Sequence, residues 1–179
     1  MTDRPGVPAL AAAQSHETAR LRLRLYAERD LDALSSIYGD PEQMLHIGEG
    51  KPISRAETWR AIAASLGHWA LRGYGMWAIE LKATGAFVGR AGFIDPEGWP
   101  EFELGWQVAR EHWGQGYAPE AAAFALDFAR TRLGRKRVVS LIRPGNAPSI
   151  RVAEKIGMAP DGRIELLGGP VIRYAARFP

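Results

Sequence analysis

The sequence predicts one domain of the α/β (α+β) class, in which helices flank a twisted, mixed and mostly antiparallel sheet. Strand-like runs follow one another directly between residues 76 and 108, with short turns between them, as in an antiparallel meander. Helical segments separate the later strand-like runs, which is typical of the crossovers that join parallel strands. The 179 residues, of which 46% are apolar and 24% charged, match one globular domain with its own core.

The start of the chain is expected to be a flexible tail. Residues 1–16 are rich in Ala and Pro and lack a hydrophobic period, so we expect the domain to occupy residues 17–179. Strict alternation of Arg and Leu over residues 20–25 predicts a first strand that is buried on one face. No apolar run reaches the ~18 residues that a membrane span needs, and we expect a cytoplasmic protein without a membrane partner.

Two helices are expected after this strand. Asp30 is placed to cap a helix over residues 31–38. Ser54, followed three residues later by Glu, forms a capping box that begins a helix over residues 55–71. The apolar spacing of this second helix puts Trp59 on its buried face.

The rest of the chain alternates between strands and helices. Further strands are expected over residues 76–82, 87–94, 102–108, 137–142, 158–166 and 171–177. Helices are expected over residues 119–132 and 147–156, and Gly157 is expected to end the second of them.

The composition excludes several kinds of site. The chain has no Cys, which excludes disulfides, Cys-bound zinc, iron–sulfur clusters and a thiolate nucleophile. Its four His are scattered, so we expect no metal site. The net charge of +3 is too small to indicate a nucleic-acid partner. The densest basic group, within residues 130–137, falls at the end of a predicted helix, where cations favour the helix dipole.

A carboxylate stands in the middle of the predicted strand over residues 102–108. Strand alternation places Glu103 and Gln107 on the face opposite Leu104 and Trp106. A carboxylate at such a position is either solvated or lines a cleft.

A glycine-bearing loop follows this strand and runs straight into a helix. Glycines at 114 and 116 allow the backbone to approach a ligand, and the free N–H groups of the helix start form an anion site. The Rossmann fingerprint fails because Pro119 occupies the third glycine position, and the P-loop pattern fails because no Gly-Lys-Ser/Thr follows.

Two segments together resemble the GNAT superfamily of N-acetyltransferases, in its RimJ/RimL-like branch. Residues 113–121 read much like the W-G-x-G-Y-A-x-E-A loop of that branch, although the superfamily more often begins this loop with Gln or Arg than with Trp113. Residues 146–158 read much like its later N-x-x-S segment, with Met158 where Phe is commoner. The resemblance runs from about residue 18 to residue 178.

The resemblance implies a GNAT-like sheet whose central strands splay apart, with acetyl-CoA bound in the gap as the acyl donor and no metal. It assigns to the cofactor the residues Trp106, Gln107, Val108, Arg110, Gly114, Gln115, Gly116, Tyr117, Ala118, Asn146, Ser149 and Lys155.

The resemblance also implies direct transfer of an acetyl group to a primary amine, which is a protein N-terminus or a small molecule. Both kinds of amine are mostly protonated at pH 7, so a base is needed, and Glu103 is our first choice, acting through water. Ser149 is the candidate proton donor to the leaving thiolate. The alternative is a non-catalytic acyl-CoA sensor on the same fold, and a nucleic-acid-binding module is a third hypothesis. We expect a monomer or a homodimer.

The reactive end of the cleft is expected to be acidic. The acidic residues that could attract a cationic amine there are Glu49, Asp95, Glu97, Glu101 and Glu103. The alternative interpretation is that all of them except Glu103 are solvated loop charges. His46 is expected on a solvated face.

Overall fold

The computed structural model describes residues 15–179, so most of the expected tail lies outside the described residues. The expected boundary at residue 16 lies inside a strand, because His16 pairs with Leu23 across two antiparallel strands. The His16 ring also packs 5.3 Å from the ring centres of both Phe124 and Phe128. His16 is therefore part of the folded domain, not of a tail.

Within residues 15–179 the strands form one eight-stranded sheet, in the order β1-β2-β3-β4-β5-β6-β8-β7. The strands are β1 (His16–Glu17), β2 (Leu21–Arg24), β3 (Met76–Leu81), β4 (Phe87–Ile94), β5 (Glu103–Val108), β6 (Arg137–Ile142), β7 (Ala159–Leu166) and β8 (Gly169–Arg177). Neighbouring strands are antiparallel except for β5 and β6, which are parallel. The mixed, mostly antiparallel sheet predicted from the sequence is confirmed.

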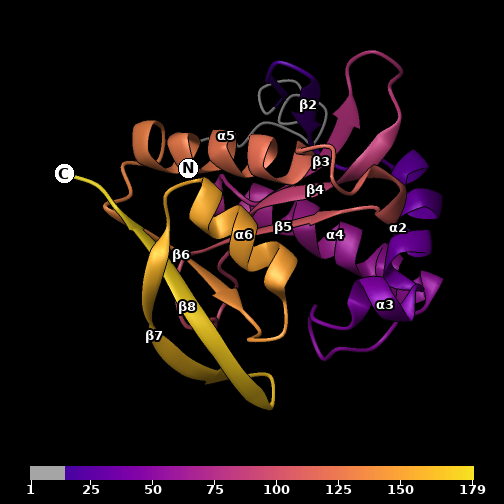
Figure 1. The fold of residues 1–179 in the computed structure, drawn as a ribbon. Coiled ribbons are helices and arrows are strands. Elements are labelled where there is room, and N and C mark those ends of the chain that lie inside the picture. The colour runs from indigo at the N-terminus through magenta and orange to yellow at the C-terminus, as the bar shows by residue number, and fades with distance from the viewer. Residues whose placement is uncertain (1–14) are drawn as a thin grey trace.

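Helices cover both faces of this sheet (Figure 1). They are α2 (Leu31–Tyr38), α3 (Pro41–Met44), α4 (Arg55–Arg72), α5 (Tyr117–Thr131) and α6 (Ala147–Lys155), with short 3-10 turns at η1 (Glu28–Asp30) and η2 (Arg110–His112). In Figure 1, α5 and α6 lie in front of the central strands and α4 lies behind them.

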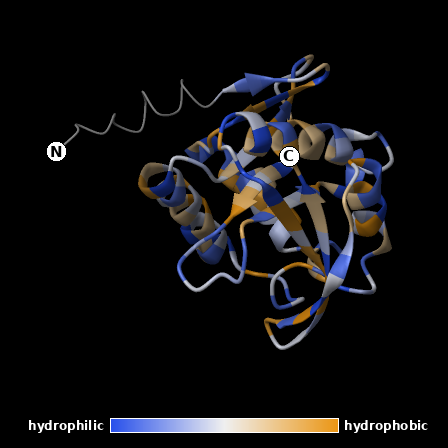
Figure 2. Cartoon of the chain, turned by 90° about the vertical axis from the view of Figure 1, so that its left-hand side faces the viewer, coloured by the Kyte–Doolittle hydropathy of each residue, from blue (hydrophilic) through white to orange (hydrophobic). Residues whose placement is uncertain are grey.

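Strand β3 shows how the two layers form. Its residues alternate between two cores: Trp77 and Ile79 pack with the α5 side, whereas Met76 and Ala78 pack with α2 and α4. Because both faces are covered, the strand is apolar almost throughout instead of alternating with polar residues. Figure 2 shows the same result, with hydrophobic residues concentrated on the central strands.

The start of α2 differs from the prediction. Asp30 makes no side-chain cap for this helix. Its carboxylate instead accepts bonds of 2.7 Å from both terminal nitrogens of Arg24 and one of 2.8 Å from the backbone N–H of Ala27. Asp30 is buried, so pairing with a cation outweighs a cap. Asp40 caps α3 by accepting from the backbone N–H of Glu42 at 2.9 Å.

Helix α4 begins at the predicted capping box and ends at Gly73, whose φ of 77° is the left-handed conformation. Its buried side differs from the prediction. Trp59 is 49% exposed, and the buried side chains are Thr58, Ile62 and Trp69. Thr58 is fully buried, and its hydroxyl is satisfied locally because it donates to the carbonyl of Ser54 at the start of the same helix.

The two parallel strands of the sheet separate soon after they meet. The register pairs β5 with β6 at a single position, Glu103 opposite Val139, and the Val139 N–H donates to the carbonyl of Phe102 at 3.2 Å. One residue further on, a side chain bridges the strands, since Ser140 Oγ donates to the Leu104 carbonyl at 2.7 Å. Beyond this point β5 and β6 diverge, and the site lies in the gap.

Candidate active site

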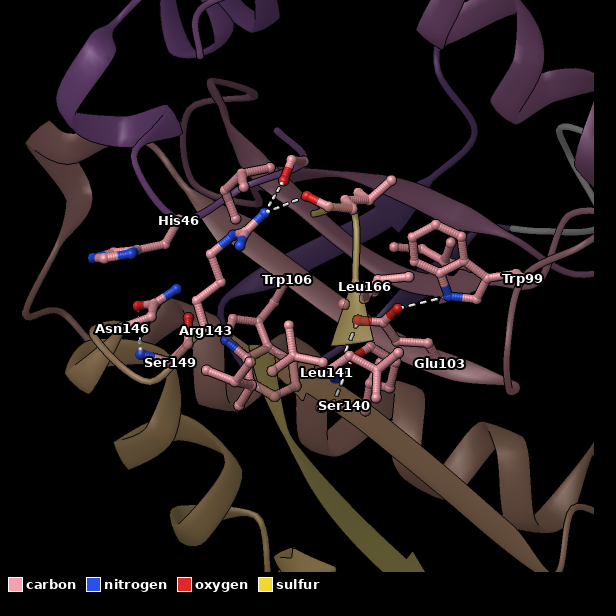
Figure 3. Close-up of a pocket in the computed structure, with 18 of the residues that line it drawn as sticks. His46, Trp99, Glu103, Trp106, Ser140, Leu141, Arg143, Asn146, Ser149 and Leu166 are labelled. Carbon is pink, nitrogen blue, oxygen red and sulfur yellow. Dashed lines mark hydrogen bonds between the residues drawn. The ribbon is translucent and has the colours of Figure 1, made fainter. Parts of the chain in front are cut away.

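A cavity of about 230 Å³ opens where β5 and β6 diverge (Figure 3). Strands β4, β5 and β6 supply its inner walls, and the start of α6 supplies one side. The loop after α3 and the turn between β7 and β8 complete the walls. Four of the predicted site residues, Glu103, Trp106, Asn146 and Ser149, line this one cavity although they are up to 46 residues apart in the sequence.

Glu103 is a buried carboxylate with two hydrogen bonds. Its Oε2 accepts from the indole nitrogen of Trp99 at 2.8 Å, and its Oε1 accepts from the backbone N–H of Leu141 at 3.2 Å. Burial raises the pKa of Glu103 to about 7, because the two hydrogen bonds and the positive charge of Arg90 only partly offset the loss of water. A carboxylate with this pKa is about half ionised at neutral pH and is suited to act as a general base.

The raised pKa predicts that protein stability depends on pH. In the unfolded chain the carboxyl group titrates near 4.5, so between pH 4.5 and 7 the folded state retains a proton that the unfolded state loses. The contribution of Glu103 to the free energy of unfolding therefore falls as pH rises through this window, by about 3 kcal/mol in all. We expect wild type to lose stability relative to Glu103→Gln between pH 5 and pH 8, as measured by urea unfolding. A constant difference between the two proteins would contradict the raised pKa.

Asn146 and Ser149 lie on the side of the cavity opposite Glu103 in Figure 3. Asn146 caps α6, since its Oδ1 accepts from the backbone N–H of Ser149 at 3.2 Å. This cap holds both residues at the cavity wall. Between them and Glu103 lies Trp106, whose indole N–H is buried and has no hydrogen-bond partner within residues 15–179.

Two other predicted β5 residues do not present free groups to the cavity. The Gln107 side chain bonds to Arg90 and to the backbone of Gln43, away from the cavity lining. The carbonyl of Val108 accepts from the indole nitrogen of Trp113 at 2.6 Å. Any cofactor contact by Gln107 therefore has to use its backbone.

The predicted glycine loop lines a separate hollow on the surface. Gly114 and Gly116 have φ of 76° and 80°, a conformation that favours glycine, and α5 begins directly behind them without a side-chain cap. The N–H groups of its first turn are therefore free for an anion. Gln115 and Lys155 also line the hollow, whereas Tyr117 and Ala118 do not.

The cation beside this loop is not the predicted one. Arg110 lies 2.9 Å from Asp40 and 2.8 Å from Glu42, so its charge is already balanced away from the hollow. Arg20 lines the hollow instead, where it donates to the carbonyl of Gln115 at 2.8 Å and pairs with Glu120 at 2.7 Å. Sequence reasoning missed Arg20 because it lies 95 residues before its partner.

The cavity is not acidic, contrary to the prediction. Of the five acidic residues considered, only Glu103 lines it, and Glu101, for example, pairs with Arg137 and Arg173. Two arginines, Arg90 and Arg143, line the cavity, together with His46, which is half-buried and not on a solvated face. An arginine inside an otherwise apolar strand was a signal for Arg90, but nothing local in the sequence pointed to Arg143, His46 or Trp99.

Residues 15–179 contain neither a metal-binding cluster nor a membrane-spanning helix. No group of three or more His, Cys, Asp or Glu is arranged to hold a metal ion there. No helix there is long and apolar enough to cross a membrane.

The chain is similar to known proteins over most of its length. The family model for the acetyltransferase (GNAT) domain matches residues 20–159. The uncharacterized protein YkkB of Bacillus subtilis (strain 168) is 36% identical over 88% of this chain and 92% of its own length. The uncharacterized N-acetyltransferase p20 of Bacillus licheniformis is 31% identical over 81% of this chain and 82% of its own. The crystal structure of an acetyltransferase from Agrobacterium tumefaciens str. C58 is 32% identical, with a TM-score of 0.83 over 92% of this chain and 94% of that one.

Proposed function

Since the chain belongs to the GNAT acetyltransferase family, we propose that it moves an acetyl group directly from acetyl-CoA to a primary amine. The observation that carries this proposal is the buried Glu103, whose pKa of about 7 places a proton acceptor in the gap between β5 and β6. A base in this position matches the one chemical requirement of the reaction, which is to deprotonate an ammonium group.

The residues present fit acetyl-CoA at two places. The free N–H groups at the start of α5, with Gly114, Gly116 and Lys155 beside them, suit a pyrophosphate. The orphaned indole N–H of Trp106, in the wall of the gap, is a donor that lacks an acceptor until a polar group binds there. Bound acetyl-CoA supplies an activated acyl group as a thioester.

The side chains of the cavity then divide the proton transfers between them. Glu103 removes the proton from the acceptor ammonium, through water, so that the amine nitrogen can form the new bond to the acyl carbon as the carbon–sulfur bond breaks. Ser149, held by the Asn146 cap, donates a proton to the leaving sulfur and regains one from the nitrogen, which gives up its second proton as the amide forms. This donor contributes modestly, because a thiol with a pKa near 8.5 leaves readily as a thiolate. The chain contains no Cys to carry an acyl group, which favours direct transfer.

The acceptor is a small molecule, or a protein whose N-terminal residue alone enters the cavity. A cavity of about 230 Å³ is below the ~300–1,000 Å³ that ligand pockets usually have, so a bulky acceptor does not fit inside it. The cytoplasmic location and the monomeric or dimeric state expected from the sequence stay predictions.

The proposal is tested by measuring acetyl-CoA binding by calorimetry and thiol release with a broad panel of primary amines, including peptides. We expect binding, and thiol release that requires both the protein and an amine. Binding without thiol release on any amine would contradict the transferase and favour a sensor on the same fold.

A further inference from the structure

Arg143 extends across the cavity and links two separate segments of the chain by hydrogen bonds. One of its terminal nitrogens donates to the carbonyl of Gly48 at 2.9 Å and to that of Leu167 at 3.4 Å (Figure 3). These carbonyls belong to the loop after α3 and to the turn between β7 and β8, and both residues line the cavity. The other terminal nitrogen and Nε of Arg143 have no hydrogen-bond acceptor among residues 15–179.

Arg90 approaches the same cavity from β4. Its Nε donates to the Gln107 side chain at 3.2 Å, and its guanidinium group lies 5.2 Å from the ring centre of Tyr38. These contacts hold the side chain in place without neutralising it. Both terminal nitrogens of Arg90 lack an acceptor in the described chain.

Neither arginine has a carboxylate partner within 4.0 Å in residues 15–179, although both are half-buried. Other half-buried arginines of this chain are paired: Arg24 contacts Asp30 and Glu80, and Arg173 contacts Glu101 and Asp161. The carboxylate that lines the cavity, Glu103, carries at most one negative charge, so the cavity stays positive even when Glu103 is ionised. Two fixed, unpaired guanidinium groups in a cavity indicate an anionic ligand there.

We propose that the amine acceptor carries a carboxylate close to its amine, and that Arg90 and Arg143 bind this carboxylate while Glu103 takes the proton from the amine. The inference rests on the proposed acetyltransferase function and names its substrate class, a small amino acid. Its side chain is apolar, because Met76, Ile94, Leu166 and Val171 line the remaining walls.

The test compares three forms of one acceptor: L-leucine, leucinamide and isoamylamine, with L-phenylalanine, phenylalaninamide and phenethylamine as a second set. We expect thiol release from acetyl-CoA with kcat/KM at least about tenfold higher for each amino acid than for its amide or its amine. The amide has the less basic amine, so more of it is deprotonated at pH 8. A preference for the amino acid over its amide therefore does not come from the fraction of free amine, which makes the amide the decisive comparison.

The variants Arg90→Gln and Arg143→Gln assign the preference to the two arginines. Each is expected to lower kcat/KM for the amino acid by about 10- to 100-fold, as expected when a charge-assisted hydrogen bond is lost, and to lower it far less for the uncharged forms. The Kd for acetyl-CoA is expected to stay at its wild-type value. Arg130→Gln is the matched control, because Arg130 is an exposed residue of α5 that pairs with Asp127.

The outcomes separate this inference from the proposed function. Equal or better use of the amides and amines by wild type would overturn the inference and leave the transferase intact. Thiol release with other amines but with neither amino acid would also overturn it. No release with any amine, despite binding of acetyl-CoA, would contradict the transferase itself.

Discussion

Replacement of Glu103 with Gln is expected to lower kcat/KM for acetyl transfer at pH 8 by about 10²- to 10⁴-fold. The amide has nearly the same shape as the carboxylate but cannot accept a proton from an ammonium group. One amide oxygen can still accept from Trp99 or from the backbone of Leu141, so the variant retains part of the contacts that hold this side chain. Initial rates of thiol release at several amine concentrations measure the effect.

The control for this variant is Glu97→Gln. Glu97 is fully exposed in the turn between β4 and β5. Its replacement with Gln removes the same charge from the same part of the chain. We expect its kcat/KM to equal that of wild type. If Glu103→Gln also stays within about threefold of wild type, while its unfolding transition is intact, Glu103 is not the base.

Replacement of Gly89 with Ala is expected to lower the free energy of unfolding by about 3 kcal/mol or more. Gly89 lies in β4 with a φ of 153°, and a Cβ at this position comes within 2.2 Å of the carbonyl oxygen of Gln107 and 2.8 Å of the Cα of Val108. Both atoms are backbone of β5, so they cannot turn aside as a flexible side chain does. The added methyl therefore has to push β5 away from β4, and with it one wall of the active-site cavity.

Gly85→Ala is the matched control for this steric effect. Gly85 also has a positive φ, of 71°, but a Cβ there meets nothing within 4 Å. Only the backbone preference is lost, which costs about 1 kcal/mol. Urea unfolding of the two variants measures the difference. An equal loss in the free energy of unfolding would show that the close approach of β4 and β5 adds no steric cost at Gly89.

Elements with strong local signals were predictable from the sequence. The strands Phe87–Ile94 and Arg137–Ile142 begin and end where the alternation and the turn residues predicted. The capping box predicted the start of α4, because its two hydrogen bonds join residues only three positions apart and are therefore visible in the local sequence.

The errors in the fold have tertiary causes. Asp is a common helix N-cap, but Asp30 pairs with Arg24 instead because neighbouring elements bury its carboxylate. The exposure of Trp59 depends on which face of α4 meets the sheet, and helical spacing alone does not decide between adjacent faces.

The candidate site was also predictable only in part. Alternation along the strand, together with the family resemblance, predicted that Glu103 and Ser149 belong to one cleft, and both line the cavity. The charge of that cavity was not predictable, because it depends on side chains brought together from distant segments. The carbonyls that hold Arg143 are 95 and 24 residues away from it in the chain.

The pH dependence of kcat/KM between pH 6 and 9, for wild type and Glu103→Gln with one amine acceptor, tests the proposed role of Glu103 most directly. Because the base must be deprotonated and the acceptor binds as an ammonium, wild-type kcat/KM is predicted to rise through a pKa near 7 and then to level off. The variant, which lacks the base, is predicted to lack the rise near 7 and to show only the rise caused by the amine's own deprotonation at higher pH. The same profile in both proteins, including the rise near 7, would contradict the assignment of Glu103 as the base.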